Sequence, residues 1–287
     1  LRPSMVRGDA VTQLCDEIKV KEGYELDKVY SKFLTVVRTA QDRQAAHFQG
    51  IFHIFAQHFT REANVMRQLL ILKILLTFEA VPEHRVELAT THNFLWTALF
   101  QLAEVDREAS KTDVDPATRE VLIEMVVHWL NFLAVLLRDD KSLQHVAGQL
   151  TRDRLPADPF TGVVAGRRRM GRARTPAAVQ CVTVGLHIVE RLVSVPLVAR
   201  LFATSPSNLE DLAVCIEQSV TLDQQAQVYR VVFHLATSGL LSSALSIPIL
   251  AQGNNPEEES HPACQVVDSL YRALHGLAGG AKVWADP

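Results

Sequence analysis

The sequence predicts an all-α protein, and three observations support this prediction. Apolar residues recur at intervals of three and four along most of the 287 residues, as they do on one face of an amphipathic helix. Neither the two-residue alternation of strands nor the Asn-Gly and Asp-Gly dipeptides of tight hairpins occurs convincingly. The composition, 48% hydrophobic and 21% charged, is typical of a globular protein with a sizeable core.

Three amphipathic helices are predicted before residue 60. Each has four apolar residues at positions i, i+3, i+4 and i+7: Val11, Leu14, Cys15 and Ile18; Leu26, Val29, Tyr30 and Phe33; Phe48, Ile51, Phe52 and Phe55. The segment from Glu62 to Phe78 is apolar on most sides, so we expect a central helix that is covered by neighbours on several faces.

The helices predicted beyond residue 90 have recognisable starts. They cover Phe94–Ala103, Ala117–Leu137, Ala177–Val193, Leu209–Gln218, Gln224–Thr237 and Pro262–Leu277. Asp115-Pro116 and Thr175-Pro176 place a capping side chain before a proline at the first helical position, and Ser207-Asn208 precedes Leu209. Two segments interrupt the helices: an Arg-rich loop at residues 151–175 and an acidic loop at residues 252–260.

A repeated segment indicates how the helices are organised. AVPEHRVELATTHNFL, residues 80–95, matches SVPLVARLFATSPSNL, residues 194–209, at an offset of 114 residues. In both copies a long apolar helix precedes Val-Pro, and a second helix follows. A weaker version, residues 138–150, lies between them. Division of the offset by three predicts a unit of about 38 residues, near the repeat length of helical solenoids.

The repeated segments, within 66–102, 121–150 and 179–216, resemble armadillo-type repeats and, more loosely, HEAT repeats. The shared features are a long helix, a Pro that ends it, and an Arg and a Leu-Ala pair in the short helix that follows. The regular glycine turn of armadillo repeats is absent, so "armadillo-like" is the closer description. The resemblance implies one domain over residues 1–287, a right-handed α-solenoid.

The same resemblance implies a non-enzymatic scaffold or adaptor that binds a helix or an extended segment of a protein partner, within a larger complex. We expect no cofactor and no small-molecule substrate. Two alternatives stay open: a nuclear protein that associates with nucleic acid through the Arg-rich loop, and an all-α enzyme with a pocket between helices.

The Arg-rich loop contains the sharpest candidate site. Its basic side chains are Arg167, Arg168, Arg169, Arg172 and Arg174. They are candidates for a phosphate or nucleic-acid contact, an import signal or a dock for an acidic partner, and a merely solvated loop is the simpler alternative. No aromatic residue lies among them, which disfavours a stacking platform for single strands. Trp284, which follows Gly279-Gly280, is a further candidate partner contact, or an unattached chain end.

Other candidate sites are weaker. Glu124 and His128, and His187 and Glu190, share helix faces, but neither pair has the Glu-x-x-His order of a dimetal bundle, and no HExxH occurs. We therefore interpret the eleven histidines as partly buried and hydrogen-bonded rather than metal-binding. No Gly-rich phosphate loop or nucleophile elbow is present. Asp139-Asp140 is interpreted as the cap of a short helix.

The net charge and the cysteine content restrict the classes of partner and the cellular compartment that we expect. The net charge of −3 provides no overall basic field for nucleic acid or anionic membranes. The four cysteines, Cys15, Cys181, Cys215 and Cys264, form no CxxC pair and are predicted to be reduced thiols of a cytoplasmic or nuclear protein. The longest apolar run is about half a membrane span, so a soluble protein is expected. The chain does not begin with Met, which is compatible with part of a longer protein.

Overall fold

The chain is helical throughout the part that is described. A computed structural model describes residues 3–61, 64–109, 111, 113–152, 176–218 and 221–237. Within these residues there are helices and no strand, so the predicted all-α class is confirmed. The chain divides into two compact units, Leu1–His145 and Val146–Pro287. The single domain over residues 1–287 stays a prediction.

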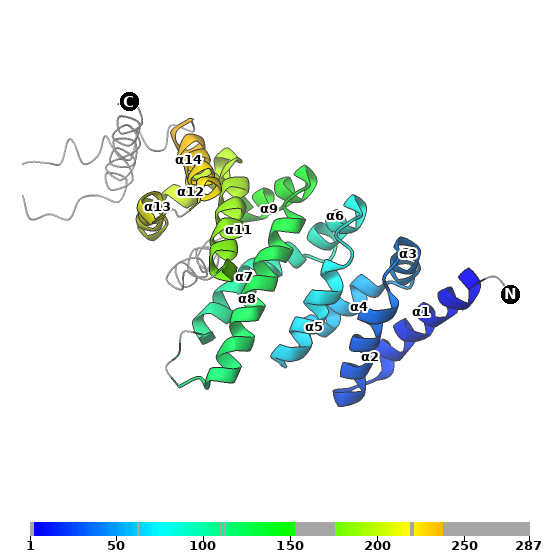
Figure 1. Cartoon of the computed structure of the whole chain (residues 1–287). Helices are drawn as coiled ribbons and strands as arrows, with labels where there is room; N and C mark the ends of the chain where they lie inside the picture. The colour runs from blue at the N-terminus through cyan, green and yellow to red at the C-terminus, as the bar shows by residue number, and fades with distance from the viewer. Residues whose placement is uncertain are drawn as a thin grey trace, which may run out of the picture. The chain divides into compact units, whose positions relative to one another are not determined.

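The first unit is built from helices that pack in chain order. They are α1 (Pro3–Val20), α2 (Gly23–Val36), α3 (Ala40–Phe48), α4 (Ile51–Arg61), α5 (Val65–Leu76), α6 (Pro82–Thr90), α7 (Phe94–Ala109) and α8 (Pro116–Leu136). Helix α2 packs on α5, and α5 packs on α8, so each of these two helices contacts the helix three places later (Figure 1). Helix α7 lies along α8, and the short helix α6 contacts both. Helix α9 (Asp140–Arg152) leads into the second unit.

The second unit has the same order of helices as α5 to α8 of the first unit: a long helix, a short helix and two further helices. Its described helices are α11 (Pro176–Val193), α12 (Pro196–Ala203), α13 (Pro206–Gln218) and α14 (Leu222–Thr237). Helix α11 packs on α14, three helices later. The short helix α12 is bent by 117° from the second part of α11 and contacts α11, α13 and α14. In both units, a short helix therefore packs against the longer helices that surround it.

The core of the first unit lies around α5 and α8. Helix α5 buries Leu69, Ile71, Leu72, Ile74 and Leu75, which face several directions, so the prediction of a central helix is confirmed. Trp129 of α8 is fully buried, and its ring meets Phe59 edge to face with 5.1 Å between the ring centroids.

Several predicted helix starts are confirmed. Asp115 accepts a hydrogen bond of 3.0 Å from the backbone N–H of Thr118, and Pro116 takes the first helical position. Helices α7 and α11 begin at Phe94 and Pro176, within one residue of their predicted starts. Asn64, which was not predicted as a cap, also caps α5, because its side chain accepts from the N–H groups of Met66 and Arg67.

Several boundaries differ from the predictions; helix α7, for example, continues to Ala109 instead of ending at Ala103. Helix α13 begins at Pro206, because the carbonyl of Ser205 already accepts from the N–H groups of Asn208 and Leu209. The predicted helix through Phe48 is broken at Gly50, which has a φ of 71°, a left-handed conformation that glycine adopts without strain. Phe48 consequently ends α3 and is 77% exposed instead of lying on the apolar stripe of α4.

The short helices share one burial pattern. Helices α3, α6, α9 and α12 begin at residues 40, 82, 140 and 196. In each, the third and seventh residues are buried: Asp42 and Ala46, His84 and Leu88, Ser142 and Val146, Val198 and Phe202. Among the described residues, α9 is the short helix between α6 and α12, and the three starts are 58 and 56 residues apart. Residues 153–175, between α9 and α11, lie outside the described residues, so the predicted unit of about 38 residues stays a prediction.

Other predictions fall largely outside the described residues. Of the loop at 151–175, only Thr151 and Arg152 are described, and they end α9. The acidic loop at 252–260 and the helix predicted over Pro262–Leu277 lie outside. Among the described residues no helix taken singly has the length and apolar composition to cross a membrane. Two pairs of consecutive helices have that length and composition when the two helices of a pair are taken together. The helices within these pairs are bent relative to each other by 109° and 117°.

Candidate functional site

The sequence predicts six side chains as partner contacts. They are Arg167, Arg168, Arg169, Arg172, Arg174 and Trp284, and all lie outside the described residues. The described part of the chain instead contains three polar clusters that sequence reasoning did not identify. Each joins helices that lie far apart in the sequence.

The first is the histidine cluster, defined as His47, His84, His92 and Glu87. Nε2 of His47 on α3 lies 2.6 Å from Oε2 of Glu87 on α6, and Nε2 of His92 lies 3.3 Å from Oε1 of the same carboxylate. The rings of His47 and His84 overlap at 4.4 Å between centroids and an interplanar angle of 37°. One carboxylate therefore serves two imidazoles, while a third imidazole stacks on one of them.

Aromatic side chains surround this cluster. The ring of Phe52 on α4 lies 5.1 Å from that of His47 and 5.5 Å from that of His84, measured between centroids. Phe78, at the end of α5, lies 5.8 Å from His84. Since His84 is buried, its imidazole is held in a largely apolar environment between α3, α4 and the turn that follows α5.

This environment favours the neutral form of His84. Burial, followed by the nearby His47, lowers the pKa of His84 below its usual value of 6.5. Within the described residues, Nδ1 of His84 and Nε of Arg43 are buried without a hydrogen-bond partner. Burial opposes the ionisation of Glu87, but the hydrogen bonds from His47 and His92 outweigh it, and the pKa of Glu87 is lowered.

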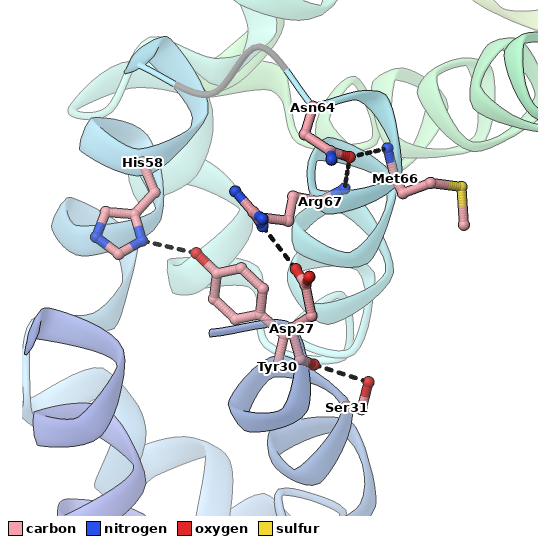
Figure 2. A network of polar contacts seen from close by, with 7 residues as sticks. All are labelled: Asp27, Tyr30, Ser31, His58, Asn64, Met66 and Arg67. Atoms are coloured by element: carbon pink, nitrogen blue, oxygen red, sulfur yellow. Dashed lines mark hydrogen bonds and ion pairs between the residues drawn. The ribbon is translucent and has the colours of Figure 1, made fainter. Parts of the chain in front are cut away.

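The second cluster joins α2 to α4 and α5 (Figure 2). The buried phenol of Tyr30 points at His58, with 2.6 Å between its oxygen and Nδ1. One turn earlier on α2, Asp27 accepts a hydrogen bond of 2.6 Å from Nε of Arg67. Arg67 is also one of the two residues whose N–H groups are capped by Asn64, so the start of α5 is fixed both to its own cap and to α2.

The third cluster joins α6 to the start of α9. Nε and Nη2 of Arg85 donate to the two oxygens of Asp139 at 2.7 and 3.0 Å, and Nη1 donates to the carbonyl of Glu79 at 2.5 Å. Asp139 directly precedes α9, as predicted for a cap, but its carboxylate is bound by this arginine. This bidentate geometry is the strong form of an Arg–carboxylate pair.

Several predictions about individual residues can be compared with the structure. His58 contacts Tyr30 while His53 is exposed and lies 2.8 Å from Gln57, so the two histidines occupy different faces of α4. The Glu124 carboxylate accepts from Lys73 of α5, and His128 contacts only the backbone of Glu124. Among the described residues, no group of three or more His, Cys, Asp or Glu side chains is arranged to hold a metal ion.

Neither of the described thiols is part of a disulfide, and the two differ in exposure. Cys15 is buried and Cys215 is partly exposed. Burial raises the pKa of the Cys15 thiol to about 11, which keeps it protonated and unreactive at neutral pH.

Comparison with known proteins adds no relative. No protein-family model matches the chain, and no curated protein matches it.

Proposed function

We propose that this chain is a non-enzymatic scaffold or adaptor, an armadillo-like α-solenoid that binds a helix or an extended segment of a protein partner. The observation that carries the proposal is the shared pattern of the short helices α3, α6, α9 and α12, which bury their third and seventh residues. A unit that recurs with the same buried positions is the basis of a solenoid.

The ends of the long helices repeat as well. Val81 and Val195 precede α6 and α12 with nearly the same backbone angles, φ −106° and ψ 115° against φ −91° and ψ 118°, and each is followed by a proline. The fourth residue of α3 and of α6 is an arginine whose Nη1 donates to a carbonyl just beyond the preceding long helix, Arg43 to Arg38 and Arg85 to Glu79.

The packing of every third helix supports the same architecture. In a solenoid, equivalent helices of successive units lie side by side and each unit covers the exposed face of the one before. The contacts of α2 with α5 and of α5 with α8 in the first unit, and of α11 with α14 in the second, have this form. Stacked units of this kind offer a long surface, which suits an extended ligand better than a small one.

In this proposal the five arginines of the Arg-rich loop are an accessory electrostatic contact and Trp284 is an apolar one. Arginine and tryptophan are enriched among the residues that dominate binding energy at interfaces. The protein would act in the cytoplasm or the nucleus as part of a larger complex.

The test is affinity purification from lysate followed by mass spectrometry. We expect the wild type to retain a defined set of proteins, and a variant with all five arginines replaced by Ala to lose some of them. A matched variant with five Lys keeps the charge but not the bidentate donors, so it separates the two contributions. Recovery of the same partners with the Ala variant would remove the loop from the mechanism.

The same variants decide between protein and nucleic acid as the partner. Binding to duplex and single-stranded DNA is measured from low to moderate salt. An affinity that falls steeply with salt and disappears in the Ala variant would favour the nucleic-acid alternative. The scaffold proposal expects no binding even at low salt.

A further inference from the structure

The contact between α3 and α6 is made by ionisable side chains. His47 of α3 contacts Glu87 and the ring of His84, and both of these belong to α6. Histidine is the side chain whose unperturbed pKa places its charge change in the physiological range. The strength of this contact therefore depends on proton concentration, unlike that of an apolar one.

The third position of a short helix does not require a histidine. In α12 the equivalent residue is Val198, which is fully buried, and in α9 it is Ser142. Since an apolar side chain fills this position elsewhere in the same chain, the imidazole of His84 is not needed for packing. It adds a titratable group to a buried site that could be filled without one.

The charged neighbours of His84 cannot balance several imidazolium groups. The charged and titratable side chains that act on it are Arg43 and His47 on α3 and Glu83 and Glu87 on α6. Beyond them, His92 before α7 contacts Glu87, and His53 on α4 contacts the ring of His92. Glu87 already accepts from both His47 and His92, so it is not free to balance a further positive charge on His84.

We propose that the histidine cluster is a pH-sensitive joint, which holds α3 and α6 together at neutral pH and loosens at mildly acidic pH. The stacked pair is the sensor. A proton on His84 is opposed by burial and by repulsion from His47 and Arg43, and the rings of His84 and His47 lie only 4.4 Å apart between their centroids. Separation of α3 from α6 relieves that repulsion and exposes His84 to water.

The direction of the pH dependence follows from His84. Its pKa is lower in the folded protein than the usual 6.5, so the unfolded chain binds this proton more readily. The contribution of neutral His84 to stability is fully present above pH 6.5 and is lost as the pH falls from 6.5 through the lowered value. Glu87, with a pKa lowered from 4.5, loses its contribution only at lower pH, outside this window.

The thermal midpoint Tm, measured by circular dichroism between pH 7.5 and 5.5, tests the joint. Three proteins are compared: the wild type, His84→Val, which copies α12, and His187→Gln, a half-exposed histidine of the second unit. We expect the wild type to lose about 2–4 °C more than His84→Val over this range. His187→Gln should follow the wild type.

An equal loss of Tm in the wild type and in His84→Val would overturn the proposal. Should His84→Val fail to fold, the imidazole resonances of the wild type are titrated by NMR together with the backbone amides of α3 and α6. The proposal expects these amides to shift or broaden as His84 takes up its proton. Amides that stay unchanged through that titration would equally overturn it.

Discussion

Arg85 and Asp139 are 54 residues apart in the sequence and are joined by two hydrogen bonds of 2.7 and 3.0 Å. The arginine belongs to α6, and the aspartate stands at the start of α9. Their side chains are 13% and 19% exposed, so the pair is largely shielded from solvent. One guanidinium thus ties together the starts of two successive short helices and also the turn after α5.

Replacement of Arg85 by Ala should lower the free energy of unfolding of the first unit by about 2 kcal/mol, because Asp139 then keeps a shielded charge without its donors. Urea unfolding followed by circular dichroism measures the change. Arg107→Ala is the matched control, since this arginine is 66% exposed and pairs only within one helical turn. This control should lower the free energy of unfolding by less than about 0.5 kcal/mol. Equal losses of unfolding free energy in the two variants would show that the Arg85–Asp139 pair contributes no more to stability than an exposed ion pair.

Tyr30→Phe removes the hydroxyl that contacts His58 and leaves the packing of the ring in place. We expect a loss of about 1 kcal/mol, the usual net value of one hydrogen bond. Tyr24→Phe, at an exposed position of the same helix, should change the unfolding free energy by less than about 0.5 kcal/mol. A double-mutant cycle with His58→Gln isolates the pair, and a coupling energy near zero would contradict the assignment.

The burial pattern of the short helices predicts that two substitutions within α12 differ strongly in their effect on the free energy of unfolding. Phe202→Ala removes a buried seventh residue and should cost about 3–5 kcal/mol. Leu197→Ala changes the second residue, which is 54% exposed, and should cost less than about 1 kcal/mol. Chemical unfolding of the two variants is the measurement. Similar losses would show that the repeated pattern does not report on packing.

The two described thiols should differ in reactivity. At pH 8, iodoacetamide should modify Cys215 faster than Cys15, because Cys15 is buried and its pKa of about 11 leaves little thiolate. Mass spectrometry of the digested protein measures each site separately. In denaturant the difference should disappear, since both thiols then have ordinary pKa values and full access. A fast reaction of Cys15 in the native protein would contradict its buried position.

Much of the fold was predictable because helix signals are local. The apolar period of α5 and the Asp115-Pro116 start of α8 depend on residues within about one turn of each other, and both predictions hold. The errors arose where a single backbone angle decides the outcome. Gly50 breaks the apparent stripe from Phe48 to Phe55, and no count of apolar residues reveals its positive φ. The predicted repeat length of about 38 residues stays a prediction, because residues 153–175, between the two matching segments, lie outside the described residues.

The polar clusters could not have been predicted from local sequence patterns. His47 and Glu87 are separated by 40 residues, and Tyr30 and His58 by 28, so their contacts exist only because α3 packs near α6 and α2 near α4. Only the tertiary structure decided that one carboxylate serves two imidazoles, or that Arg85 meets Asp139. The sequence by itself determined the helical class, most helix boundaries and the matching segments around Val81 and Val195, because these depend on short-range periodicity and capping. Pairing across distant helices depends on how their apolar faces are covered, which is a property of the whole packed unit.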